Sequence, residues 1–367
     1  MKTKSNKQFM ILSVIGITIM VMCHFAGEIF KYLKAFPFIA IFIFISGYFY
    51  KKDNEENIWK YISYKFKKLM IPFFILNLIY GILVNIFKSA GIISYGSSIT
   101  LYTLFVQPFI NNSQFIFNFP AWFVPTLFLV NVCYIIIHKL SSKKKFLNDY
   151  VLLAIFVSLN IVTVYFKDIC HIQEWIMIIF KVLFFLPFFH FGYIYKEKWQ
   201  QYDEKIPNIP YILLMFAINF TIYKIFGDLI YDMHDFADFK TNNIVLPFIT
   251  SVISILFYTR IAKILSKWLG ENKFINYISN HTSTIMTHHI FIMFLFNLIL
   301  YAINLKVDVP YFNMEIFKRG WICVYEVPGW IIFQQLFYVV LGITGPLFLQ
   351  YVFDKIKKKI EFFRRKK

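Results

Sequence analysis

The sequence predicts an all-α integral membrane protein, a bundle of about ten transmembrane helices with both termini in the cytoplasm. Three observations lead to this fold class. The 367 residues are 59% hydrophobic and only 16% charged, whereas ordinary soluble domains carry about 25% charged residues. Apolar runs long enough to cross a bilayer recur along the whole chain. Basic residues outnumber acidic ones by 38 to 20 and gather in alternate connecting segments. This composition excludes a soluble enzyme.

A helix needs about 20 mostly apolar residues to cross the bilayer core, so the apolar runs define the expected spans. They lie near residues 9–27, 36–50, 69–87, 122–138, 150–166, 176–195, 209–227, 244–262, 283–303 and 330–353. The longest segments between them, 88–121 and 304–329, are too short to form an independent domain. The chain is therefore expected to be a single transmembrane domain over 1–367, and any chemistry must lie within or beside the bundle.

The distribution of basic residues predicts the orientation. If the N-terminus is cytoplasmic, 28 of the 38 basic residues fall in inside segments, as the positive-inside rule requires. The run Lys355–Lys367 is then a topology anchor beside anionic lipid, so we expect lipid and not nucleic acid as a partner. The segment Met1–Lys7 and the apolar run after it are interpreted as a first transmembrane helix and not as a cleaved signal peptide.

Ionisable groups inside apolar runs are costly, and they mark candidate functional sites. His24 lies late in the first run, towards the outer half of the membrane, and Glu28 follows at i+4 on the same helical face. A carboxylate there could fix the imidazole tautomer of a general base. The alternative is a histidine that only bonds a neighbouring helix. His288 and His289 lie nearer the cytoplasmic side and point about 100° apart, so at most one of them faces His24.

A basic cluster, Lys65, Lys67 and Lys68, lies at the cytoplasmic mouth of the third expected span. These lysines could bind an anionic group, although the positive-inside rule alone also predicts lysines there. Trp122 could stack on a sugar ring or simply belong to an aromatic belt.

The remaining polar candidates have modest expected roles. Ser46, beside Gly47, is interpreted as a point of close helix packing more readily than as a nucleophile. Asn280 is explained first by helix capping. The four cysteines lie far apart without a zinc-type spacing, so we expect no metal.

Five blocks in order resemble the integral-membrane acyltransferase 3 family, which O-acylates cell-envelope carbohydrates. They are Val21–Phe25 with its histidine, Phe44–Phe49 like F-x-S-G-Y-F, Lys65–Pro72 like R-x-x-R-L-x-x-P, Ala121–Pro125 like a W-F-x-P helix start, and Asn280–His289 like a late Ser/Thr-rich segment ending in histidine. Two departures stand out. Ser13 occupies the position where the family has Arg or Lys, and Lys65 and Lys68 replace arginines, which loses the bidentate fork that arginine offers phosphate.

The resemblance implies a multi-pass protein of the bacterial inner membrane that takes an acetyl group from acetyl-CoA and passes it to a sugar hydroxyl of a surface polysaccharide. It implies that His24 is the general base, oriented by Glu28, and that the lysine cluster meets the CoA phosphates. Trp122, Ser46, Asn280, His288 and His289 are possible substrate or support residues. Two alternatives stay open: a carbohydrate transporter or flippase, and a polysaccharide polymerase, which would be expected to carry a more basic outer loop than 88–121.

Overall fold

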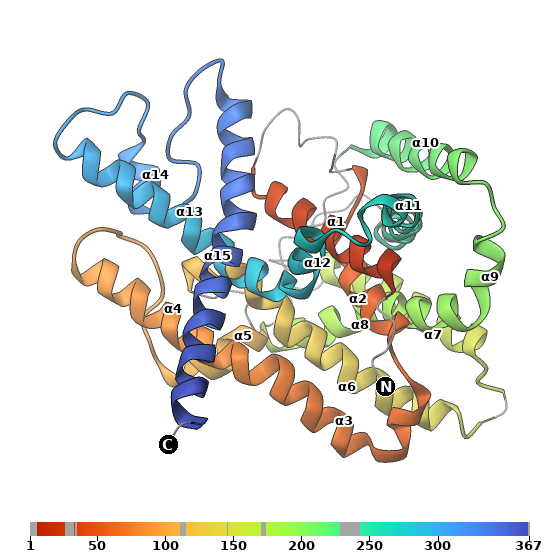
Figure 1. Cartoon of the computed structure of the whole chain (residues 1–367). Coiled ribbons are helices and arrows are strands. Elements are labelled where there is room, and N and C mark those ends of the chain that lie inside the picture. Colours follow the sequence, from red (N-terminus) through yellow and green to blue (C-terminus); the bar gives the residue numbers. More distant parts are fainter. Residues whose placement is uncertain are drawn as a thin grey trace.

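The structure is a computed structural model that describes residues 6–25, 33, 35–110, 115–144, 146–169, 174–227 and 243–365. It is 81% helical, and these ranges contain no strand, which confirms the predicted fold class (Figure 1).

The α-helices are α1 (Lys7–Met22), α2 (Ala40–Tyr48), α3 (Ile58–Lys65), α4 (Ile71–Ser89), α5 (Gln107–Ile110), α6 (Phe123–Ser141), α7 (Asp149–Ile169), α8 (Glu174–Ile194), α9 (Gln200–Asp203), α10 (Asn208–Phe226), α11 (Leu246–Leu269), α12 (Lys273–Asn280), α13 (Thr282–Asn304), α14 (Met314–Lys318) and α15 (Ile331–Arg365). Short 3₁₀ and π segments join or extend them: η2 (Lys52–Asn57), η3 (Phe66–Met70), η4 (Tyr102–Val106), η5 (Ile116–Trp122) and η6 (Tyr195–Trp199).

Eight helices of the described chain are long and apolar enough to cross a membrane. They are Lys52–Ser89, Ile116–Ser141, Asp149–Phe166, Trp175–Asp203, Asn208–Phe226, Leu246–Leu269, Thr282–Asn304 and Ile331–Lys359. The first two predicted spans also form helices, but α1 has 16 residues and α2 has 9. At 1.5 Å per residue, α2 is far too short to cross a bilayer alone. The total of about ten spans therefore stays a prediction.

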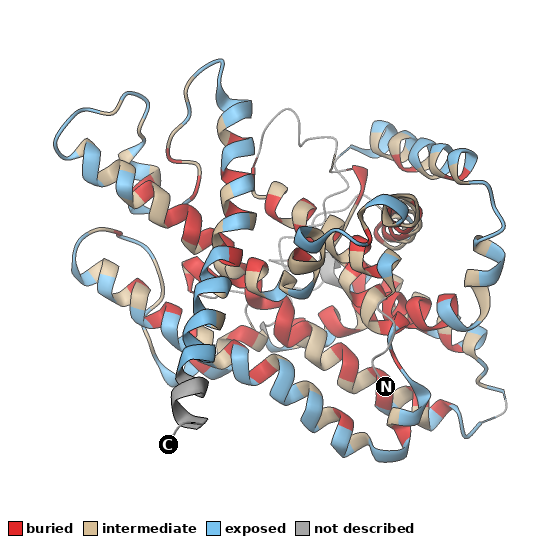
Figure 2. Cartoon of the chain, in the orientation of Figure 1, coloured by how far each residue is buried: buried red, intermediate tan, exposed pale blue. Residues whose placement is uncertain are grey.

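Helix α8 lies at the centre of the bundle, against α2, α6 and α7. In its most apolar stretch, 67% of the residues are buried, compared with 11% in α10. Figure 2 shows this contrast, with buried residues concentrated in the middle of the bundle and a mostly exposed α10. Because both helices are strongly apolar, the exposed surface of α10 is the kind that lipid covers.

Two glycines allow α2 and α8 to cross at backbone contact. A Cβ atom on Gly47 of α2 would lie 1.8 Å from the carbonyl oxygen of Phe189, and one on Gly192 of α8 would lie 2.1 Å from that of Phe44. Small residues are the usual means by which membrane helices approach this closely. The close-packing interpretation of the Ser46–Gly47 pair therefore holds at Gly47.

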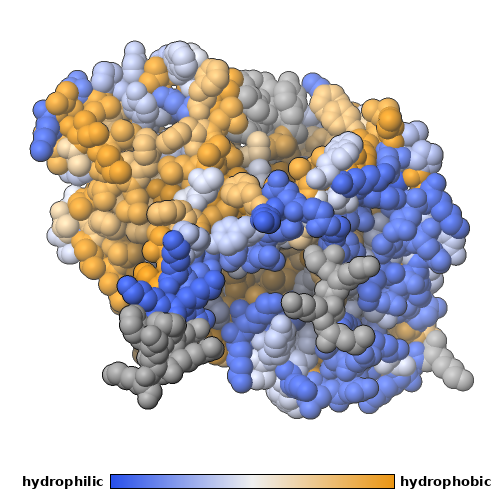
Figure 3. Space-filling model, viewed as in Figure 1, coloured by the Kyte–Doolittle hydropathy of each residue, from blue (hydrophilic) through white to orange (hydrophobic). Residues whose placement is uncertain are grey.

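Polar contacts connect the helix ends on the side predicted to be cytoplasmic. His138, at the end of α6, donates from Nδ1 to Oε1 of Glu55 at 2.6 Å, and Lys139 donates to the Glu55 carbonyl oxygen. Asp149, at the start of α7, pairs with Lys198 of η6 at 2.7 Å. Hydrophilic residues gather at the right and lower right of Figure 3, over the region of α3 and α9, while apolar residues cover the upper left, over α13.

Arg260 of α11 is a buried structural residue, although its charge is counted among the inside-positive residues. Only 1% of it is exposed. Its guanidinium pairs with the carboxylate of Asp203 at 2.9 Å, donates to the carbonyl oxygens of Asp203 and Ile206, and lies 4.0 Å from the ring of Tyr211. Arg260 therefore fixes the connection between α9 and α10 against α11.

Candidate functional site

His24 lies in the turn that follows α1, and its nearest aromatic neighbours come from two distant parts of the chain. Its ring centroid is 5.0 Å from that of His289 in α13, with the two planes 28° apart. The ring of Phe119, from η5, meets it edge-on at 5.3 Å. The structure thus brings together His24 and one of the two adjacent histidines that the sequence marked.

The predicted relation between His24 and Glu28 stays a prediction. Helix α1 ends at Met22, and His24 lies in the turn that follows it. Glu28 itself lies outside the described residues. Among the described residues, the polar ring that lies against His24 is His289.

A pair of serines joins the segments that carry His24 and His289. The hydroxyl of Ser13 in α1 lies 3.0 Å from that of Ser279 in α12. His24 follows Ser13 by eleven residues, and His289 follows Ser279 by ten. The position of His289 nearer the cytoplasmic side stays a prediction. In the structure α12 precedes α13, and both helices contact α1.

His288 and His289 diverge as their adjacent positions predicted. His288 Nδ1 lies 2.5 Å from the hydroxyl of Tyr80 in α4, whereas His289 faces His24 and has its Nδ1 2.8 Å from the carbonyl oxygen of Ile285. The two rings therefore belong to different surroundings, and only His289 contributes to the site around His24.

An aromatic column connects this site with the surface. The exposed ring of Trp321, which precedes α15, stacks on Phe119 at 6.0 Å, and Phe119 in turn contacts His24. Trp321 is 40% exposed, whereas Trp122 is only 6% exposed and has the ammonium of Lys181 5.8 Å from its ring. For Trp122 the sequence left open a sugar-stacking role or a place in an aromatic belt. The exposed tryptophan connected to His24 through Phe119 is Trp321, which no sequence motif marked.

Lys67 and Lys68 lie on the π-helical segment η3, which is followed by a proline, and Lys65 is the last residue of α3. Pro72 has no backbone N–H to give to the carbonyl of Lys68, and the preceding N–H, from Ile71, instead bonds Phe66 five residues back. Such π turns are frequent at functional sites. Lys67 and Lys68 are exposed and Lys65 is half-buried. Within the described part of the chain, no carboxylate pairs with any of the three.

Helix α13 links the lysine segment to the histidines. Met70, the last residue of η3, is fully buried in a cluster that also touches Met286 of α13. The same Met286 packs on the cluster that contains Val21 and Phe25, which flank His24. Met286 is one turn before His289 and lies on the same side of α13. This side of α13 therefore extends from the end of the basic segment to the paired histidines.

The other predicted site residues lie apart from His24. Ser46 donates its hydroxyl to the side-chain oxygen of Asn131 at 3.3 Å, and Asn280 is an exposed residue that ends α12. Burial raises the pKa of the Cys323 thiol to about 12, so this thiol stays protonated and is a poor nucleophile. In the part of the chain that the structure describes, no group of three or more His, Cys, Asp or Glu side chains could hold a metal ion.

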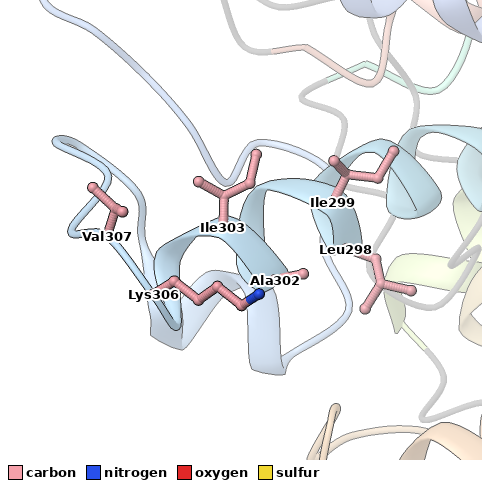
Figure 4. Close-up of a pocket in the computed structure, with 6 residues that line it drawn as sticks. All are labelled: Leu298, Ile299, Ala302, Ile303, Lys306 and Val307. Carbon is pink, nitrogen blue, oxygen red and sulfur yellow. The ribbon is translucent and has the colours of Figure 1, made fainter.

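A groove of about 530 Å³ opens along the far part of α13 (Figure 4). Its lining is apolar apart from one lysine, and it consists of Leu298, Ile299, Ala302, Ile303, Lys306 and Val307. The first of these is nine residues beyond His289, or about 13 Å along the helix. The groove is therefore separate from the site around His24.

Comparison with known proteins gives one match. The model of a family described as an acyltransferase domain covers residues 11–351, nearly the whole chain. No curated protein and no solved structure matches. The matched range includes His24, the lysine cluster, Phe119, Trp321 and His289.

Proposed function

Because the chain belongs to the acyltransferase 3 family and is thus a membrane acyltransferase, we propose that it transfers an acetyl group from acetyl-CoA to a sugar hydroxyl of a bacterial surface polysaccharide. One observation carries this proposal: His24 lies at the inner end of an aromatic column, between a surface tryptophan and a buried second histidine. A half-buried imidazole in such a place can take a proton from a hydroxyl that enters from the surface.

In the proposed reaction His24 is the general base. The acceptor hydroxyl oxygen forms a bond to the thioester carbonyl carbon while its proton passes to the imidazole. The carbon–sulfur bond then breaks, CoA leaves as the thiolate, and the proton returns to the sulfur. A base positioned in this way typically contributes about 10²–10⁴ to the rate.

The lysine cluster suits the donor. CoA carries a diphosphate and a 3′-phosphate, and Lys65, Lys67 and Lys68 offer three ammonium groups that no described carboxylate neutralises. From that segment the pantetheine arm would follow the side of α13 that carries Met286 towards His24. The acceptor would enter at the opposite end, where the exposed face of Trp321 can stack on a sugar ring.

The first experiment compares purified surface polysaccharide from host cells with and without the gene. We expect methyl signals of O-acetyl groups in the NMR spectrum, removable by mild alkali, to disappear with the gene and to return when it is restored. An unchanged acetyl pattern together with less polymer at the surface would contradict the proposal and favour a transporter.

Exchanging Lys65 and Lys68 for alanine is expected to raise the KM for acetyl-CoA by roughly tenfold or more, with little change in kcat. Hydrogen bonds to charged groups contribute about 1.5–3 kcal/mol each, and 1.4 kcal/mol corresponds to a tenfold change. Lys60→Ala is the matched control, because Lys60 is an exposed lysine five residues before Lys65 on α3 and outside the cluster. If the double variant has the same KM for acetyl-CoA as Lys60→Ala, the cluster serves only as a topology anchor.

A further inference from the structure

His289 has a defined tautomer. Its Nδ1 lies 2.8 Å from the carbonyl oxygen of Ile285, one turn back in α13. A carbonyl oxygen only accepts hydrogen bonds, so Nδ1 must carry the proton. In the neutral ring the lone pair then resides on Nε2, which is the arrangement that a proton acceptor needs.

The Nε2 atom of His289 is buried without a hydrogen-bond partner among the described residues, and the side chain is 0% exposed. A buried polar atom left unsatisfied costs about 1–3 kcal/mol, and such atoms in native structures call for an explanation. A structural histidine would be expected to use both ring nitrogens, as His190 does with the hydroxyl of Tyr134 and the carbonyl oxygen of Asp149. His289 uses only one.

The packing around His289 holds the ring against His24. A Cβ atom added to Gly342 of α15 would lie 3.5 Å from the Cβ of His289 and 3.2 Å from a methyl group of Val21. Helix α15 therefore passes close behind α13 and the end of α1 at this level. The two imidazoles lie 5.0 Å apart in this enclosed setting, where a proton on one ring disfavours a second proton on the other.

We propose that His289 is a second proton acceptor, so that the base of the site is the pair of His24 and His289. This inference rests on the proposed acetyl transfer. The hydroxyl proton that leaves as the new carbon–oxygen bond forms is taken up by the pair, which holds one proton more than its two neutral rings, with Nε2 of His289 as one of the positions for that proton. When the carbon–sulfur bond breaks, the thiolate takes up that proton and both imidazoles return to the neutral form.

Chemical rescue tests the role of the ring nitrogen. In membranes with the full chain, acetyl transfer is measured from acetyl-CoA to the host's surface polysaccharide after mild alkali has stripped its O-acyl groups. His289→Ala should lower kcat by about 10²-fold or more. Imidazole should restore a substantial part of the activity, because it fits the space left and supplies a basic nitrogen. Pyrrole has the same ring size and an N–H for the carbonyl oxygen of Ile285, but no basic nitrogen, and should not restore activity.

His281→Ala is the matched control. His281 also bonds through Nδ1 to the carbonyl oxygen four residues back, that of Tyr277, at 2.8 Å, but it lies eight residues before His289, in the turn that joins α12 to α13. Its variant should keep its activity and show no response to imidazole. His289→Gln, which fills more of the space than alanine, should be folded and impaired.

Different results overturn different claims. If membranes with the wild-type protein show no acetyl transfer, the proposed function itself is contradicted. With active wild type, equal rescue of His289→Ala by pyrrole and imidazole, or full activity of His289→Gln, would overturn the role of His289 alone and leave His24 as the base.

Discussion

We expect the Gly47→Ala substitution to reduce the yield of folded protein to a small part of the wild-type yield. Its Cβ would lie 1.8 Å from the carbonyl oxygen of Phe189, and real Cβ contacts essentially never fall under 3.0 Å. Helices α2 and α8 would have to separate by about 1.2 Å or more, because a backbone carbonyl cannot move aside as a side chain can. That separation weakens packing in the most buried part of the bundle. Yield of monodisperse protein in detergent and the midpoint of thermal unfolding measure the effect.

Two comparisons make this prediction specific. In Gly16→Ala, the nearest atom to the new Cβ is the end of the Phe42 ring, at 3.0 Å, and we expect only a small loss of stability. Gly192→Ala should resemble Gly47→Ala. The double variant should lose less than the sum of the two, since helices already forced apart leave room for the second methyl group. Additive losses would show that the two glycines do not share one crossing.

The sequence predicts helices well and their contacts poorly in this chain. Each of the ten apolar runs contains a helix, because apolar length is a local property that the bilayer requires. Composition alone assigned the charge of Arg260 to membrane orientation. Its structural role depends instead on its contacts with Asp203 and Tyr211, which the sequence does not reveal. The bond between His138 and Glu55 joins residues 83 positions apart, and no periodic pattern contains such a distance.

In the candidate site, too, the sequence predicts single residues better than the contacts between them. His24 could be found from the sequence because an ionisable residue in an apolar run is unusual. Its contact with His289 joins residues 265 positions apart, and the nearby contact between Ser13 and Ser279 spans 266. Trp321 lies in a connecting segment, where a tryptophan has no distinguishing pattern, and only its stacking on Phe119 identifies it.

His24→Ala is expected to abolish acetylation while the protein still folds in membranes. The side chain is half-buried at the end of α1, so its loss removes little packing, whereas the rate should fall by about 10²–10⁴-fold without the base. His24→Gln, which keeps much of the side-chain volume but has no basic nitrogen, should lose activity to a similar extent. The measurements are O-acetyl NMR signals of the surface polysaccharide and the amount of folded protein in the membrane.

Cys23→Ala provides the control, because Cys23 lies in the same turn, is also half-buried, and packs on the core. It should keep wild-type acetylation. Equal losses in Cys23→Ala and His24→Gln would attribute the effect to the turn after α1 and not to the imidazole. Full acetylation by both His24 variants would contradict the base assignment. Because His289 lies 5.0 Å away with its own lone pair, any activity left in His24→Gln should vanish when His289→Gln is added, which separates a shared base from a single one.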